Sequence, residues 1–229
     1  MAKIAGVLGG LGPEATVDFL AKLVAGTDAE SDQDHVRLLI DHNPTVPNRH
    51  DAIAGRAPSV GPELAEMAAG LERAGADFLV MVCNTAHAYT AEIRAAVSVP
   101  FISIVDVTVE AVVAAGHRQV GVMAAEGCLR AELYQQALAA AGCEPVLWSD
   151  EELETFMALV YRIKAGERDE DITSGISRLA TSLVFSGAEA LVAGCTEIPL
   201  MLAAENAPAP LYSSTDLLVQ RTIQLAQAQ

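Results

Sequence analysis

The chain has 229 residues, a length that allows one large domain or two small ones. Apolar residues make up 52% of it and charged residues 19%, a balance that excludes intrinsic disorder. Its formal charge of −16 would repel a phosphate backbone, so we expect no nucleic-acid partner. No apolar run reaches the length of a membrane span. We therefore expect no membrane contact and a location in the reducing cytoplasm.

The expected elements are short apolar runs that alternate with longer amphipathic stretches. In the first half, strands are predicted at residues 4–8, 36–40, 78–82 and 101–105, and helices from Pro13 and at residues 63–74 and 88–97. Two prolines, two asparagines and alternating charges predict an ordered loop over residues 41–56. Strands separated by helices indicate an α/β fold with parallel sheets.

A glycine-rich turn follows the first predicted strand, over residues 9–12. Its spacing matches neither the dinucleotide fingerprint nor the phosphate-binding loop, so we expect no nucleotide cofactor. We interpret it as a tight turn into a helix that also places a backbone group, at Leu11, against a small ligand.

An internal repeat divides the chain into two similar halves. Three matches occur in the same order: residues 75–83 with 187–195, Gly6 with Gly121, and Pro100 and Asp106 with Pro210 and Asp216. The offset at the two cysteines is 112 residues, close to half the chain. Self-similarity at one period is a property of the fold. It predicts two similar parallel-sheet α/β domains with a cleft between them.

The repeat places one cysteine at the end of a buried strand in each half, Cys83 and Cys195. Ligands of open α/β sheets bind beyond the carboxyl ends of the strands, so both thiols would face one cleft. Helix starts after each cysteine would bind an anion and lower the pKa of the thiol. Two acid–base groups on opposite sides of a carbon can remove a proton from one face and return one to the other, which is racemisation or epimerisation.

Packing is the alternative for these cysteines, because cysteine is among the most buried residue types. Cys128 and Cys143 have no repeat partner, and we interpret them as buried and inert. The cysteines form no C-x-x-C pair and the histidines show no ligand spacing, so neither a disulfide framework nor a metal site is expected. His87, four residues after Cys83, could tune that thiol or simply cap and pack.

Five segments together resemble the aspartate/glutamate racemase family, most closely its aspartate racemase branch. They are GVLGGLGPEAT at residues 6–16, DHNPTVPNR at 41–49, CNTAH at 83–87, IKAG at 163–166 and GCTEIP at 194–199. They extend over nearly the whole chain. The resemblance implies a cofactor-independent amino-acid racemase that acts on a small acidic amino acid and forms a homodimer.

The resemblance also implies roles for individual residues. Cys83 and Cys195 would be the two bases, and Asn84, Thr85 and Thr196 would hold the α-carboxylate of the substrate, with Leu11 and Glu197 as further substrate contacts. Arg49 and Lys164 would bind the side-chain carboxylate; from composition alone, each is a solvated charge. The implied domains are residues 1–106 plus 211–229 and residues 107–210, because the C-terminal helix would return to the first domain.

One segment departs from the family pattern. Many members carry Ala-Thr-x-Gly-Thr after the first strand of the second domain, whereas residues 124–128 read AAEGC. The loss of two hydroxyls leaves glutamate or a neutral amino acid open as the substrate.

Three alternatives to an aspartate racemase remain at this level. They are a racemase of broader range, a maleate-type isomerase or decarboxylase that uses one cysteine as a covalent nucleophile, and a non-catalytic protein that binds acidic amino acids.

Overall fold

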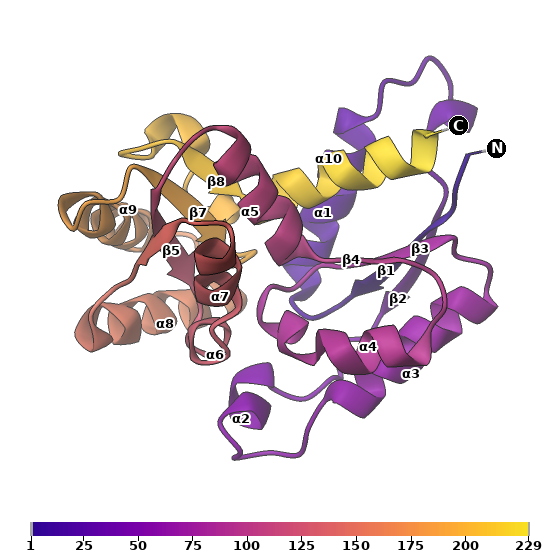
Figure 1. Ribbon diagram of the computed structural model, residues 1–229, viewed down its shortest axis with the longest axis horizontal. Helices are drawn as coiled ribbons and strands as arrows, with labels where there is room; N and C mark the ends of the chain where they lie inside the picture. The colour runs from indigo at the N-terminus through magenta and orange to yellow at the C-terminus, as the bar shows by residue number, and fades with distance from the viewer. Residues whose placement is uncertain (1, 229) are drawn as a thin grey trace.

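The computed structural model describes residues 2–228 and contains two four-stranded parallel sheets, each flanked by helices (Figure 1). The strand order is β2-β1-β3-β4 in the first sheet and β6-β5-β7-β8 in the second. Each position in the first order therefore has a counterpart in the second. This is the two-sheet α/β architecture that the internal repeat predicts.

The first half contains the first sheet and its helices. Its elements are β1 (Ala5–Gly9), α1 (Pro13–Gly26), β2 (Leu38–His42), α2 (Arg49–Ile53), α3 (Gly61–Arg73), β3 (Phe78–Met81), α4 (Thr90–Ala96) and β4 (Phe101–Ile102). The prediction of a continuous loop over residues 41–56 is wrong, because the segment contains the end of β2 and the short helix α2. Strand β4 ends earlier than predicted because Ser103 Oγ accepts a hydrogen bond from Asp106 N at 3.1 Å and starts a helix.

The second half repeats this arrangement. Its elements are α5 (Ile104–Ala114), β5 (Gln119–Ala124), α6 (Glu126–Arg130), α7 (Leu133–Ala140), β6 (Glu144–Val146), α8 (Asp150–Lys164), α9 (Glu170–Phe185), β7 (Ala190–Gly194), β8 (Leu211–Ser213) and α10 (Ser214–Gln227). Helix α8 begins with a reciprocal cap between Ser149 and Glu152, which fixes the start of the helix.

The repeat extends to individual packing contacts. A Cβ atom on Gly6 would lie 2.5 Å from Leu79 Cδ2, and one on Gly121 would lie 2.7 Å from Leu191 Cδ2. Both glycines therefore allow the same close approach between the first and third strands of their sheets. The similarity that appears in the sequence is thus a similarity of three-dimensional packing.

Two helices cross between the halves. Helix α5 follows β4 of the first sheet but packs against α7 and β8 of the second half. Helix α10 follows β8 but lies along α1 of the first half, and its end bonds to the N-terminal segment, Lys3 N to Ala226 O at 2.9 Å (Figure 1). The C-terminal helix thus contacts α1 of the first half as well as α5.

The exact domain division remains a prediction. Residues 211–213 form β8, which pairs with β7 in the second sheet although the predicted division assigns them to the first domain. The first and last residues of that division lie outside the described residues. One apolar cluster includes Val7, Val122 and Leu218, so the halves share a core. No helix within residues 2–228 is both long and apolar enough to cross a membrane.

Candidate active site

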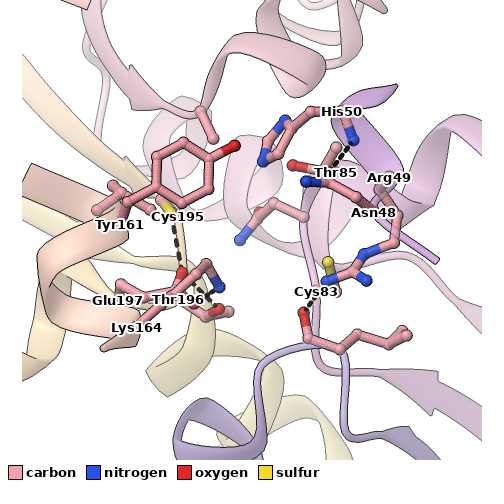
Figure 2. A pocket seen from close by; sticks show the side chains of 14 residues that line it. Asn48, Arg49, His50, Cys83, Thr85, Tyr161, Lys164, Cys195, Thr196 and Glu197 are labelled. Atoms are coloured by element: carbon pink, nitrogen blue, oxygen red, sulfur yellow. Dashed lines mark hydrogen bonds and ion pairs between the residues drawn. The ribbon is translucent and has the colours of Figure 1, made fainter. Parts of the chain in front are cut away.

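A cavity of about 140 Å³ lies between the two halves, beyond the carboxyl ends of β3 and β7 (Figure 2). All the site residues predicted from the sequence line it: Leu11, Arg49, Cys83, Asn84, Thr85, Lys164, Cys195, Thr196 and Glu197. Ala125, from the segment that departs from the family pattern, also lines it, and the sequence interpretation missed the other lining residues: Asn48, His50, Val160 and Tyr161.

The two repeat-matched cysteines face this cavity from opposite sides, one from each half (Figure 2). Both are free thiols, and Cys83 is 7% and Cys195 6% exposed. Bulk water therefore reaches the thiols only through the cavity. Cys128 is fully buried in the shared core, and Cys143 Sγ donates to a backbone carbonyl, so these two pack as predicted.

Cys195 has an acidic partner. Its Sγ donates a hydrogen bond to Glu197 Oε2 at 3.0 Å. Burial raises the pKa of the Cys195 thiol well above its usual value, and Glu197 raises it further, against the opposing charge of Lys164. The expectation that a helix start lowers the pKa of this thiol is therefore wrong. Only a short 3-10 turn follows Cys195, at Ile198–Leu200.

Glu197 and Lys164 form an ion pair at the wall of the cavity. Burial alone would raise the pKa of Glu197, but Lys164 and the Cys195 thiol hold it below its usual value. Lys164 is the last residue of α8, where the helix dipole favours a cation. A Cβ on Gly12 would lie 3.0 Å from Glu197 Oε1 and 3.5 Å from Lys164 Nζ, so the glycine leaves room for the pair.

Arg49 is held by backbone carbonyls. Its Nη2 donates to Leu11 O at 2.7 Å, and its Nη1 donates to Val46 O and Pro47 O, each at 3.0 Å. These bonds join the loop after β2 to the glycine-rich turn after β1. The guanidinium thus fixes the position of Leu11 while it borders the cavity.

Comparison with known proteins identifies the family. The protein-family model described as Asp/Glu/hydantoin racemase matches residues 8–222 of this chain. The chain belongs to the Asp/Glu/hydantoin racemase family. It is therefore a racemase, an enzyme of the isomerase class.

Individual relatives resemble this racemase over nearly its whole length. The broad specificity amino-acid racemase RacX of Bacillus subtilis (strain 168) is 26% identical over 227 residues, which cover 95% of this chain and 96% of that protein. The aspartate racemase of Picrophilus torridus superposes with a TM-score of 0.84 at 27% identity, covering 99% of this chain and 95% of that one. An aspartate racemase homologue from Pyrococcus horikoshii OT3 gives 0.82 at 25% identity and full coverage of both chains.

His50 links the halves of the racemase beside the cavity. Its Nδ1 accepts a hydrogen bond from Gly127 N, in α6 of the second half, at 3.1 Å. Burial lowers the pKa of His50, and the charges of Arg49 and Lys164 lower it further, so the ring is neutral. No ligand spacing in the sequence marks His50. The available signal was that His50 directly follows Arg49, the last residue of a segment that resembles the family.

The side chain of Asn84 is bonded within the protein. Its Nδ2 donates to Ser214 Oγ at 3.0 Å, and its Oδ1 accepts from Tyr134 OH at 2.6 Å. Tyr134 belongs to α7 and Ser214 starts α10, so this buried network ties the end of β3 to the second half.

His87 packs against the backbone beside Cys83. Its Nδ1 lies 2.7 Å from Cys83 O, and its Nε2 accepts from Ile104 N at 3.0 Å. The ring therefore carries its proton on Nδ1 and donates to the carbonyl. Burial lowers the pKa of His87 to about 4. Of the two alternatives for His87, the structure shows the capping and packing role, with the bond made to the backbone.

The segment that departs from the family pattern has one position at the cavity. Ala125 lines the cavity, whereas Cys128 is fully buried in the apolar core. Of the two hydroxyls that many family members carry here, only the one replaced by Ala125 would border a ligand.

The charged groups of the cavity leave an excess of positive charge. Arg49 and Lys164 are cationic, Glu197 is anionic and His50 is neutral, so the lining side chains sum to +1 with both cysteines protonated. Across residues 2–228, no three His, Cys, Asp or Glu side chains gather in a way that could hold a metal ion.

Proposed function

We propose that this racemase interconverts L- and D-aspartate without a cofactor, with Cys83 and Cys195 as the two bases. The observation that carries the proposal is the pair of thiols, which come from equivalent positions of two similar halves and face one cavity from opposite sides. A planar carbanion between them would be accessible to a proton on either face.

The reaction requires one thiolate and one thiol. The thiolate takes the α-proton and leaves the electron pair of the Cα–H bond on Cα, where the α-carboxylate delocalises it. The opposite thiol then donates its proton to the other face of Cα. We assign binding of the α-carboxylate to Thr85, Thr196 and the backbone N–H groups after each cysteine, because both threonines are buried and act as preorganised donors.

Charge supports a dicarboxylate as the substrate. Aspartate has a second carboxylate in its side chain, which complements the two cations that line the cavity. Lys164 and Arg49 are the cations in reach of a side-chain carboxylate. The resemblance to the Picrophilus torridus aspartate racemase supports the same assignment, while RacX gives reason to test a wide panel. From the family resemblance we further propose a homodimer in the cytoplasm.

The test is a panel of L-amino acids incubated one at a time with the enzyme in D₂O and followed by proton NMR. We expect aspartate to lose its α-proton signal. After the enantiomers are separated on a chiral column, deuterium should appear early in D-aspartate while unreacted L-aspartate keeps its proton. Early deuteration of both enantiomers together would indicate one shared base and contradict the two-base proposal. Faster reaction of another amino acid would overturn only the substrate. If none of the amino acids exchanges its α-proton, the proposed function is overturned.

A further inference from the structure

The two halves differ at the second residue after each strand-end cysteine. The first half has Thr85 at this position, and the second has Glu197, which is 5% exposed. Glu197 accepts a hydrogen bond from the Cys195 thiol. No hydrogen-bond partner is recorded for the sulfur of Cys83 within residues 2–228. The racemase therefore treats its two thiols differently before any substrate arrives.

The contact between Cys195 and Glu197 requires a neutral thiol. An ionised carboxylate can only accept a hydrogen bond, so the proton must be on sulfur. A thiolate 3.0 Å from the carboxylate would place two like charges together in a buried site, which is strongly unfavourable. Lys164, on the other oxygen of Glu197, keeps that carboxylate ionised and so preserves its ability to accept.

We propose that Glu197 is a positioning residue that holds Cys195 as the neutral thiol in the resting enzyme, so that Cys195 begins the cycle as the proton donor and Cys83 as the base. This inference rests on the proposed two-base function. It replaces the role of substrate contact that the family resemblance implied for Glu197.

The proton balance of one cycle follows from this arrangement. Cys83 takes the α-proton and Cys195 gives up its own, so product leaves behind a Cys83 thiol and a Cys195 thiolate. The resting state returns when Cys83 releases a proton to water and Cys195 takes one from water. Until Cys195 regains its proton, Lys164 is the cation that offsets the negative charges of Cys195 and Glu197.

Thermodynamics restricts how a change at Glu197 can appear in kinetics. The two enantiomers have equal free energies in water, so kcat/KM must be equal in both directions for every variant. Loss of Glu197 can therefore change the pH profile of kcat/KM, but the change must be the same for both directions. A direct readout of each thiol in the free enzyme is sharper than turnover.

The experiment is alkylation of the substrate-free enzyme by iodoacetamide across pH 6–10, with mass spectrometry to measure modification at each cysteine. In the wild-type protein we expect Cys83 to react well before Cys195 at pH 7.5. In Glu197→Gln we expect Cys195 to react at least about tenfold faster at that pH, equivalent to a pKa about one unit lower. The Cys83 rate should stay within about twofold, an internal reference for access to the cavity.

Two matched variants complete the test. Glu197→Asp keeps the charge and should keep Cys195 slow. Glu110→Gln removes an exposed carboxylate that pairs with Arg221 and should leave both cysteines as in the wild type. Circular dichroism of each variant checks folding.

Two outcomes would overturn the inference. One is wild-type Cys195 reacting as fast as Cys83. The other is an unchanged Cys195 rate in folded Glu197→Gln, which, with a raised KM for aspartate, would make Glu197 a substrate contact. Because alkylation needs no turnover, the two alkylation results do not depend on whether the enzyme acts on aspartate.

Discussion

The two halves of the racemase share a backbone plan but differ in how each holds its thiol. Both place a cysteine after the third strand of a four-stranded parallel sheet. The first half then has Thr85 and His87, where the second has Glu197 and Pro199. The shared backbone gives two thiols matched in position, and the side chains around them differ, because Cys195 donates a hydrogen bond to the carboxylate of Glu197.

Removing either thiol is the most severe way to test this comparison. We expect Cys83→Ser and Cys195→Ser each to lower the racemisation rate by about 10²–10⁴-fold, because each variant lacks the acid–base group on one face of Cα. Polarimetry from either enantiomer measures the loss. Cys143→Ser, at a buried cysteine away from the cavity, is the control and should remain active. Full activity in either site variant would mean that the halves are not equivalent in catalysis.

His87, whose ring bonds to Cys83 O and Ile104 N in the first half, predicts a pH dependence of stability. The pKa of the buried ring is about 4 in the folded state, against its usual value of 6.5. Between these values the unfolded chain binds the proton and the folded chain does not, so stability falls as pH falls from 6.5 towards 4. The loss from this residue approaches about 3 kcal/mol at 1.36 kcal/mol per pH unit.

The measurement is urea denaturation of the wild type and of His87→Gln at several pH values. The variant has no titrating ring, so its free energy of unfolding should change less between pH 7 and pH 4.5. If the free energy of unfolding changed with pH by the same amount in the two proteins, His87 would not be the source of the pH dependence.

The hydrogen-bond network around Asn84 joins the first half to the second. Its loss should give the next largest change in the free energy of unfolding. In Tyr134→Phe the ring stays and the hydroxyl is lost, so Asn84 Oδ1 loses its donor in a buried site. We expect the free energy of unfolding to fall by about 1–3 kcal/mol. Urea denaturation measures it, with Tyr161→Phe at the more exposed tyrosine of the cavity wall as the stability control. Equal stability of Tyr134→Phe and the wild type would show that this network does not hold the halves together.

The smallest effect is expected at the ion pair between Glu14 of α1 and Arg168 of the second half. Both side chains are partly exposed, so water and salt screen their attraction. Arg168→Ala should lower the free energy of unfolding by less than about 1 kcal/mol. A loss above 2 kcal/mol in chemical denaturation would mean that this surface pair, and not the shared core, holds the halves in place.

Local sequence patterns predicted the larger elements and the repeat, because buried strands and amphipathic helices leave periodic signals. The family segments placed the predicted site residues at one cavity. Helix α2 was missed because five residues carry too little periodicity; the local signal for it is Asn48, whose side chain caps the helix by accepting a hydrogen bond from His50 N. The high pKa of the Cys195 thiol was missed for a different reason. Burial and the orientation of Glu197 set it, and both arise only in the folded chain.

The crossing of α10 into the first half has a consequence for synthesis on the ribosome. Ser214, the first residue of α10, bonds both to Asn84, beside Cys83, and to Ala193 O, near the end of β7. In the same helix, Leu218 belongs to the apolar core that includes Phe19 of α1. The first half therefore remains incomplete during most of translation, with an apolar face uncovered. The hydrogen bonds through Ser214 that join the ends of β3 and β7 can form only after α10 has emerged.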